Sequence, residues 1–427
     1  MKYAYINGIL LDGREAMTAQ TGKAVITDGS RITAVVDQAG ADLTGCTVVD
    51  LEGKYLMPGL INLHVHLPGS GKPTSGKGDV ARLVRLLTSN PITMAAVRKI
   101  CAGYAQTQLY SGVTTIRTVG GITNVDTTLR EKIRAGKLLG PHILAADMAV
   151  SVPGGHMAGS LAHEATTPQE AAEYVAKIGK NRPDLIKLMI TGGVLDAKVK
   201  GEPGELKMAP ELVKAACDAA HGLGLKVAAH VESPEGVRVA LENGVDTIEH
   251  GAQPDETILR LFRERKAAHV ATFSPALPYA LFDRSVSHAT EMEQYNGKIV
   301  FDGIIACAKA CLENGIPVGL GTDTGCPYIT HYDMWREIYY FHKFCGVSTS
   351  FALYSATLGN AKIAGIADRT GSIAPGKQAD LLVTRDNPLE NLQALRTAAM
   401  VVIGGRLLEH PKVRKISAVE EELDKFL

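Results

Sequence analysis

Short apolar runs alternate with amphipathic segments through the middle of the chain, and this alternation constrains the fold most. Eight such runs occur: Gly59–Leu67, Gly112–Val119, His142–Val150, Asp184–Ile190, Lys226–His230, Asp246–His250, His269–Phe273 and Ile316–Gly321. Helix-like segments lie between them, as at Pro168–Ile178, Ala209–His221, Pro234–Glu242, Asp255–Lys266 and Lys298–Glu313. Eight parallel β/α units in about 250 residues predict a closed (β/α)8 TIM barrel. An open Rossmann-like sheet is the alternative, but it would need a glycine-rich phosphate turn after its first strand, and none is there.

Both ends of the chain have a different character from the middle. Short β-rich stretches precede the first apolar run, at Tyr3–Leu10, Ala24–Thr27, Ile32–Val36 and Thr47–Asp50. Similar stretches follow the last run, at Asp380–Thr384, Ala399–Ile403 and Arg406–Glu409. We therefore expect one small β-sandwich domain formed by residues 1–57 and 370–427, and a barrel domain of residues 58–369. The charged tail Ser417–Leu427 is expected to form a surface helix.

Charge and composition exclude several classes of partner. The chain has 45 Lys+Arg and 45 Asp+Glu, so its balanced charge argues against binding to nucleic acid or to an anionic membrane. No apolar run reaches the ~18 residues of a membrane span, and the first residues show no signal peptide. The 7 cysteines include no CxxC pair and are expected to be reduced thiols. These features predict a cytoplasmic protein.

Two histidines lie at the end of the first apolar run, in Leu63-His64-Val65-His66-Leu67. Side chains alternate along a strand, so His64 and His66 point the same way, which in a barrel is toward the lumen. Two imidazoles with this spacing can bind one metal ion, although a structural pair of histidines would have the same spacing. The other strands decide between these interpretations.

Four further strands carry metal-type residues, that is, residues of the kinds that commonly bind metal ions or bridge them. Lys187 lies inside an apolar strand that a barrel covers on both faces, where an unpaired ammonium is costly and needs a partner or a covalent change. His230, His250 and Asp323 end the fifth, sixth and eighth strands. Barrel strands bring these ends to the face where barrel active sites lie. The sequence therefore predicts a metal centre on that face.

These residues resemble the binuclear pattern of the amidohydrolase superfamily, over nearly the whole chain. Met57-Pro58-Gly59-Leu60 is similar to the family's entry into the barrel, and Gly371–Leu381 is similar to the stretch that leads back into the sandwich. Within the superfamily, the chain resembles the imidazolonepropionase-related branch, which includes prolidase-like dipeptidases and carboxypeptidases. The supporting stretches are Gly112–Arg117, Ser151–His156, Thr191–Val194 and Gly321–Gly325.

The resemblance implies two divalent metal ions per chain, usually Zn²⁺, bridged by Lys187 as a carbamate derived from CO₂. It also implies that His64, His66 and Asp323 bind one metal ion, and that His230 and His250 bind the other. The chemistry agrees, because a carbamate replaces a stranded cation and neutral imidazoles suit Zn²⁺. The implied reaction is hydrolysis of an amide C–N bond by a metal-bridging hydroxide, with Asp323 passing the proton to the leaving nitrogen.

The substrate implied by the branch is a dipeptide or an N-acyl amino acid, but two departures leave specificity open. Thr118 stands where relatives often have Asp, and Glu232 stands where they often have His or Tyr. His156, after Gly154-Gly155, either contacts the substrate carbonyl or carboxylate or orders its loop. Arg117 either binds a substrate carboxylate or anchors its strand, and we favour the anchor.

Other functions stay open on the same barrel. A mononuclear deaminase would lack the lysine ligand and would use a Glu three residues after the strand-five histidine, whereas Glu232 follows His230 by two. A cyclic amide, lactone or ester hydrolase would use the same metal ions. A non-catalytic scaffold should have lost ligands, and none is missing. We also expect a homo-oligomer, as is common in the branch. The segment from Pro68 to about Ile100 is expected to cover the pocket.

Overall fold

The structure is a computed structural model that describes residues 1–73 and 80–427. The chain forms two compact units, each assembled from segments that are distant in sequence. One unit contains residues 1–62, 105–116 and 331–415, and the other contains residues 63–104, 117–330 and 416–427. The domain boundaries expected from the sequence, at 57/58 and 369/370, stay predictions.

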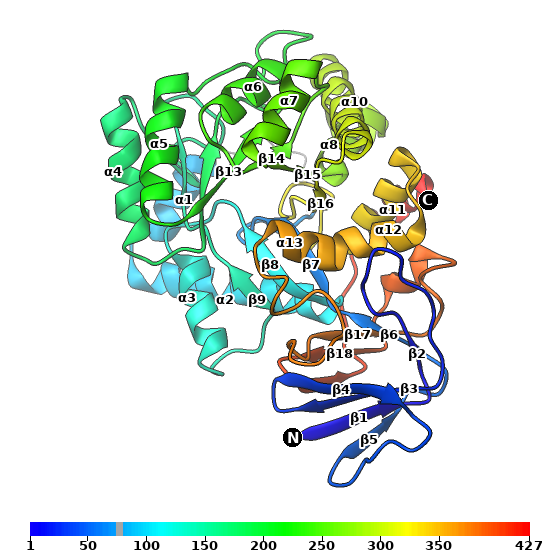
Figure 1. Ribbon diagram of the computed structural model, residues 1–427. Helices are drawn as coiled ribbons and strands as arrows, with labels where there is room; N and C mark the ends of the chain where they lie inside the picture. The colour runs from blue at the N-terminus through cyan, green and yellow to red at the C-terminus, as the bar shows by residue number, and fades with distance from the viewer. Residues whose placement is uncertain (74–79) are drawn as a thin grey trace. The chain divides into compact units, whose positions relative to one another are not determined.

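The first unit contains the β-sandwich formed by the two ends of the chain. One sheet has the order β4-β3-β1-β5, with β1 Lys2–Ile6, β3 Lys23–Asp28, β4 Arg31–Asp37 and β5 Thr47–Asp50. The other has the order β19-β18-β17-β6-β2, with β2 Ile9–Leu10, β6 Tyr55–Pro58, β17 Leu381–Thr384, β18 Met400–Ile403 and β19 Arg406–Glu409. Antiparallel pairing of β6 with β17 joins the two ends of the chain (Figure 1). Tyr5, Val25, Leu56, Leu381 and Val402 share one buried core.

Several helical segments complete the first unit. They are α11 Met334–Cys345, α12 Thr349–Tyr354, the π-helical turn η1 Ser355–Gly359, α13 Asn360–Ile363 and the 3₁₀ turn η2 Leu392–Arg396.

The barrel follows the predicted order of strands. They are β7 Leu60–Val65, β8 Val113–Thr118, β9 His142–Leu144, β10 Ala149–Ser151, β12 Leu185–Met189, β13 Lys226–Val231, β14 Thr247–His250, β15 Ala268–Ala271 and β16 Val318–Leu320. The sheet β11-β10-β12-β13-β14-β15-β16 is parallel throughout. A parallel bridge between Val65 and Thr324 joins the end of β7 to the residues after β16. This closure and the buried pattern of the strands confirm the (β/α)8 barrel.

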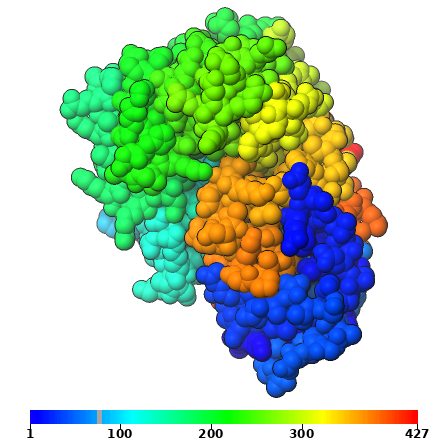
Figure 2. Space-filling model, viewed as in Figure 1, coloured from blue at the N-terminus to red at the C-terminus, as the bar shows by residue number. Residues whose placement is uncertain are grey.

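Helices connect the strands of the barrel and lie outside them (Figure 1). They are α1 Val80–Thr88, α2 Pro91–Tyr110, α3 Val125–Arg134, α4 Pro168–Gly179, α5 Pro210–Gly222, α6 Pro234–Glu242, α7 Glu256–Arg265, α8 Phe273–Leu281, α9 Arg284–Ser287 and α10 Glu291–Glu313. Thr167 and Ser233 cap α4 and α6 with their side chains, and proline at the first helical position fixes where each helix begins. Residues from α4 to α7 form a continuous green surface in the space-filling view (Figure 2).

Some elements differ from those predicted. The third run is split into β9 and β10 because Asp147, between them, has a left-handed backbone with φ of 59°. An additional short strand, β11 Ala162–Glu164, pairs with β10. Helix α10 begins seven residues earlier than expected, at a capping box formed by Thr290 and Glu293.

The tail and the segment after β7 are also helical. The tail forms α14 Ser417–Leu423 and η3 Asp424–Phe426, and Val419 and Leu423 are buried. The segment expected to cover the pocket contains α1 and the start of α2, and its residues 74–79 lie outside the described part of the chain. That covering role stays a prediction. In the described ranges, no helix is long and apolar enough to cross a membrane.

Candidate metal centre

Six side chains singled out in the sequence extend from the carboxyl ends of barrel strands or from within them: His64, His66, Lys187, His230, His250 and Asp323. Imidazole ring centres lie 5.4 Å apart for His64 and His66, 4.9 Å apart for His64 and His250, and 4.5 Å apart for His230 and His250. The Oδ1 atom of Asp323 lies 3.5 Å from Nε2 of His64 and 3.2 Å from Nε2 of His66. The four histidines and Asp323 therefore form one continuous group of side chains, the metal-type cluster.

The backbone at two of these positions is left-handed. His250 has φ of 66° and Asp323 has φ of 53°, values that residues other than glycine adopt rarely. Strict alternation along β14 would send Glu249 and His250 to opposite faces. The left-handed turn ends the strand, so Glu249 and His250 both reach His64. Such conformations are characteristic of functional sites, where the surrounding structure holds them in place.

Burial keeps His64, His230 and His250 neutral, so their ring nitrogens can donate lone pairs to a metal ion. Desolvation lowers the pKa of His64 and of His230 well below the usual range, and it lowers the pKa of His250 to about 3. Burial alone would raise the pKa of Asp323, but the neighbouring His64 and His66 lower it below the usual range of an aspartate. Neutral imidazoles and an ionised carboxylate are the forms that divalent metal ions bind.

Lys187 is fully buried on β12, and its Nζ atom has no hydrogen-bond partner among the described residues. Desolvation lowers the pKa of this amine to about 8, so its neutral, nucleophilic form is more accessible than that of an ordinary lysine. A buried ammonium without a partner is costly. Modification of the amine, or an electronegative group bound beside it, would remove that cost.

Hydrogen bonds from surrounding groups orient the histidine rings. The Nδ1 atom of His64 lies 2.8 Å from Oε2 of Glu249, and Nδ1 of His66 lies 2.9 Å from the carbonyl oxygen of Gly120. Nδ1 of His250 lies 2.7 Å from the hydroxyl of Thr272. Metal-binding histidines usually have such a second partner, which leaves Nε2 for the metal ion. Glu249 was missed in the sequence, although the argument that singled out Lys187, a charge inside a buried strand, applies to it equally.

Arg117 is buried near this cluster, and each of its three guanidinium nitrogens donates a hydrogen bond. Its Nε donates to the carbonyl of Leu63 at 2.7 Å, its Nη1 to Thr247 at 3.2 Å, and its Nη2 to both carboxylate oxygens of Glu249 at 2.7 and 2.8 Å. A guanidinium engaged in this way has little capacity for a substrate carboxylate. The geometry supports the anchoring alternative, in which Arg117 holds the glutamate that orients His64.

His156 contacts the cluster from the loop after β10. Its ring stacks on that of His230, with centres 4.1 Å apart and planes 6° apart. Its Nδ1 lies 2.5 Å from Oδ2 of Asp196, which also accepts a hydrogen bond from the backbone of Gly193 at 2.9 Å. A carboxylate beside Nδ1 leaves Nε2 as the ring atom available to a substrate. Asp196 was missed in the sequence, because its loop shows no pattern that connects it with His156.

Glu232 lies beside His230 and His250. Its carboxylate and the ligand nitrogens of His230 and His250 lie within 4.8 Å of one another. Its Oε2 atom is buried and has no hydrogen-bond partner among the described residues. Burial raises the pKa of Glu232 to about 8, and the charges of Asp323 and Asp196 add to this effect. The departure from the family pattern at this position thus lies beside the metal-type cluster.

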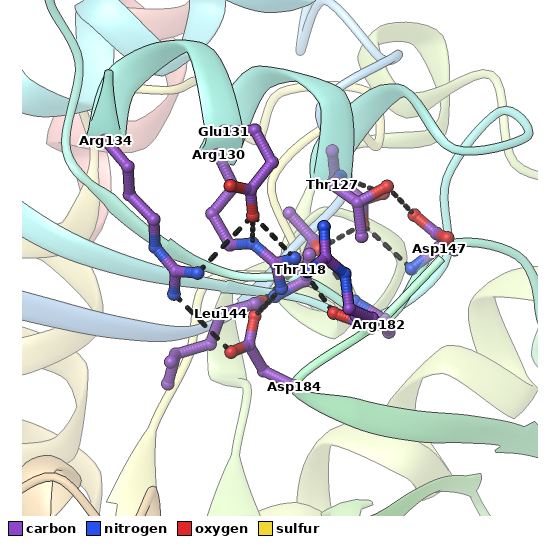
Figure 3. A network of polar contacts seen from close by, with 12 residues as sticks. Thr118, Thr127, Arg130, Glu131, Arg134, Leu144, Asp147, Arg182 and Asp184 are labelled. Atoms are coloured by element: carbon purple, nitrogen blue, oxygen red, sulfur yellow. Dashed lines mark hydrogen bonds and ion pairs between the residues drawn. The ribbon is translucent and has the colours of Figure 1, made fainter. Parts of the chain in front are cut away.

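Two buried carboxyl groups lie next to the loop that holds His66. Asp147 accepts hydrogen bonds from the side chains of Thr127 and Asn181, both at 2.8 Å, and its backbone N–H donates to Asp126 at 3.0 Å (Figure 3). Thr118 also donates to Asp126. Burial raises the pKa of Asp147 to about 8, and the neighbouring Asp126 adds to this effect. With this pKa, the Asp147 carboxyl group holds a proton at neutral pH.

This pair is connected to the metal-type cluster through two glycines. The carbonyl of Asp147 accepts a hydrogen bond from the backbone of Gly121 at 2.9 Å, and the preceding Gly120 holds His66. On the same helix α3, Arg130 forms an ion pair with Asp184 at the start of β12 (Figure 3). These contacts fix the loop that orients His66.

We expect Asp147→Asn to flatten the dependence of stability on pH. An unfolded aspartate has a pKa of ~3.9, so between about pH 4 and pH 8 the folded protein binds a proton that the unfolded chain does not. Stability therefore falls as the pH rises through this range, by at most ~1.4 kcal/mol per pH unit. Asparagine tolerates the left-handed backbone, cannot ionise and can donate to Asp126. Denaturant unfolding at pH 5 and pH 8.5 measures the difference.

On going from pH 5 to pH 8.5, the free energy of unfolding of the variant should rise by at least about 1 kcal/mol relative to that of the parent protein. Asp218→Asn, on the exposed face of α5, is the matched control and should change stability by less than about 0.5 kcal/mol at both pH values. If the free energy of unfolding of Asp147→Asn and of the parent changed equally with pH, the raised pKa of Asp147 would be contradicted.

Comparisons with known proteins agree with this geometry. Residues 55–408 match the sequence model of the amidohydrolase family. The chain is 35% identical to a solved structure from Bifidobacterium longum that is provisionally called a prolidase, with a TM-score of 0.88 and coverage of 99% of this chain and 98% of the other. It is 28% identical to a Xaa-Pro dipeptidase solved with methionine in its active site, with a TM-score of 0.83 and coverage of 96% and 100%. Ochratoxinase from Aspergillus niger is 24% identical over 391 residues, which cover 84% of this chain and 76% of that protein.

Proposed function

The chain belongs to the amidohydrolase family and is a hydrolase of carbon–nitrogen bonds, and on this premise we propose that it cleaves an amide with two metal ions. The observation that carries this proposal is the buried Nζ of Lys187 without a partner, beside neutral histidines and an ionised aspartate. A carbamate formed from this amine and CO₂ would remove the buried positive charge and offer two oxygen ligands.

The donor set fits two divalent cations, and nitrogen and oxygen donors of this kind suit Zn²⁺. Asp323, His64 and His66 would hold one ion, His230 and His250 the other, and the Lys187 carbamate both. The short distances from Asp323 to His64 and His66 support the first group. When bound, such ions lower the pKa of water toward neutrality and polarise the substrate carbonyl.

The chain's own residues would supply binding and proton transfer. Asp323 is ionised and next to the expected ligands, so it can accept a proton from the attacking water and return it to the leaving nitrogen. An amine leaves poorly unless it is protonated, so this transfer is required. His156, with Asp196 at its Nδ1, can donate from Nε2 to a substrate oxygen.

We propose a dipeptide or an N-acyl amino acid as the substrate. Support comes from the provisional prolidase and the Xaa-Pro dipeptidase, which are similar to this chain over almost its full length. Elemental analysis of the purified protein, combined with a panel of dipeptides and N-acyl amino acids, tests the proposal. Two metal ions per chain and release of a free amino acid are the expected results. A protein loaded with two ions that leaves every amide in the panel intact would contradict it.

One observation favours the deaminase alternative: Glu232 lies beside His230 and His250. A mononuclear deaminase would bind one metal ion and would not depend on Lys187. Release of ammonia from aminated heterocycles, together with one ion per chain, would favour this alternative.

We also propose that the protein is a cytoplasmic homo-oligomer. Large apolar side chains on α1 and α2 are exposed, with 54% exposure for Leu83, 65% for Leu86 and 82% for Ile92. Helix α1 has no buried residue at all. Exposed apolar surface of this kind is common at interfaces between copies. Light scattering should give a multiple of the 45.4 kDa chain mass, and a mass of one chain would refute the assembly.

A further inference from the structure

A cavity of about 590 Å³ lies beside the metal-type cluster, within the size range of small-molecule sites. Its wall includes Glu232 and Gly251, which are close in sequence to His230 and His250. The remaining wall comes from residues 201–206, the start of α6, and residues 299–303 of α10. The cavity therefore adjoins the expected reaction site through Glu232.

The charge in this cavity has one sign. Five of the residues that line it are acidic, Glu202, Glu205, Glu232, Glu235 and Asp302, and none of the described lining residues is Lys, Arg or His. Glu205 forms an ion pair with Lys207, and Asp302 forms one with Lys298. Within residues 1–73 and 80–427, the other three carboxylates form no ion pair. Glu202 and Glu235 are exposed and unpaired among the described residues, and their negative charge attracts cations to the mouth of the cavity.

Glu232 is partly buried, and its Oε2 atom lies out of contact with solvent. This atom has no hydrogen-bond partner among the described residues. The backbone of Glu232 packs closely against the loop that contains Gly204. A Cβ atom at Gly204 would lie only 2.4 Å from the carbonyl oxygen of Glu232, so there is no room for a side chain there. Glu232 thus presents a buried acceptor between the metal-type cluster and the cavity. A buried acceptor without a donor is costly, and a cationic donor would remove that cost.

We propose that this cavity binds a positively charged nitrogen of the substrate, an alkylammonium or guanidinium group, with Glu232 as its main partner. The inference rests on the proposed amide hydrolysis and names its substrate class. Leu206, Ile299 and Val300 provide apolar wall for a hydrocarbon stem, and Glu202 and Glu235 provide negative charge at the exposed rim. The charged group is either the side chain of a basic residue or a free α-amino group.

Binding of three small probes to the full-length, metal-loaded protein tests the inference by calorimetry. L-Lysine and L-norleucine share their α groups and most of their stem, and differ in the ε-ammonium. Nα-acetyl-L-lysine keeps the ε-ammonium and removes the positive charge of the α-amine. A charge-assisted hydrogen bond should favour one charged group by about tenfold to a hundredfold.

The two sources of charge give different results. If the side chain occupies the cavity, lysine binds at least about tenfold more tightly than norleucine. If the α-amine occupies it, acetylation weakens lysine by at least about tenfold. Affinities of all three probes within about threefold of one another would overturn the inference, and so would failure of all three to bind.

Glu232→Gln replaces the carboxyl group by an amide that cannot ionise beside a bound cation, and it preserves the shape of the side chain. We expect it to reduce the preference for the charged probe to below about threefold, and to leave norleucine binding unchanged. Metal content is measured on the same sample, and the titration is repeated on metal-free protein, so that a loss of metal is not mistaken for a loss of charge. Glu235→Gln, at the exposed rim, should weaken the preference by less and chiefly at low salt. Glu264→Gln, exposed on α7, is the control and should have no effect. An undiminished preference in Glu232→Gln would overturn the assignment.

Failure of this inference is distinguishable from failure of the proposed function. Amides with and without a positive charge that are hydrolysed at equal rates would refute the cation site and leave the amidohydrolase proposal intact. Discrimination between lysine and norleucine without hydrolysis of any amide would leave the cation site intact and refute the proposed reaction.

Discussion

Lys187→Ala is expected to lose bound metal and amide hydrolysis together while the barrel stays folded. Nζ is buried without a partner among the described residues, so its removal deletes no hydrogen bond that stabilises the metal-free protein. The loss of a ligand shared by both ions should reduce activity by more than about a thousandfold, since each ion contributes several kcal/mol of charge stabilisation. Elemental analysis and kcat/KM on the same preparation measure both effects.

A small carboxylic acid added to Lys187→Ala should partly restore metal binding and activity, because it can occupy the space of a carbamate. Metal-free Lys187→Met should unfold at the same temperature as the metal-free parent or at a higher one, because a buried cation is replaced by an apolar chain of similar length. Lys309→Ala, exposed on α10, is the control and should keep its metal and its activity. Full metal content in Lys187→Ala would sink the assignment of a bridging ligand.

Asp323→Asn should keep most of the bound metal and lose about a hundredfold to ten-thousandfold in kcat, the range typical for loss of a general acid–base group. Asparagine adopts left-handed backbone readily, so the φ of 53° at this position should be preserved. It can still offer an oxygen ligand, but it cannot take up the proton of the attacking water. Single-turnover kinetics on the metal-loaded variant measure the chemical step.

The same experiment identifies any replacement for Asp323. Asp218→Asn on α5 should retain the parent rate and serves as the matched control. A near-parental rate in Asp323→Asn would mean that another group moves the proton, and Glu232, beside His230 and His250, would be the first to test by Glu232→Gln in that background.

Local sequence pattern singled out many of the side chains that the structure brings together in the candidate site. The period of two along β7 sends His64 and His66 the same way, and the structure brings their rings within 5.4 Å. The cost of a buried charge singled out Lys187, which is fully buried without a partner among the described residues. The same cost applies to Glu249, which was overlooked because it stands next to a more conspicuous histidine.

Contacts between loops could not be predicted in this way. Asp196 meets His156 from a segment 40 residues further along the chain, and nothing in the spacing of the two residues indicates it. The choice between two roles for Arg117 likewise depends on Glu249, which lies 132 residues away. Such pairings depend on how barrel closure aligns distant strands, and a periodicity argument contains no information about that alignment.

By itself, the sequence determined the order of strands and helices, the sandwich formed by the two ends, and the six metal-type residues, because apolar periodicity and the cost of buried charge act locally along the chain. Only the tertiary structure decided where those side chains point and what holds them. The left-handed turns at His250 and Asp323 direct two side chains against the strand pattern, and the carboxylate of Glu232 beside a negatively charged cavity exists only once β13, β14 and α10 are packed together. Long-range packing fixes these positions, because each of them depends on residues that meet only in the folded barrel.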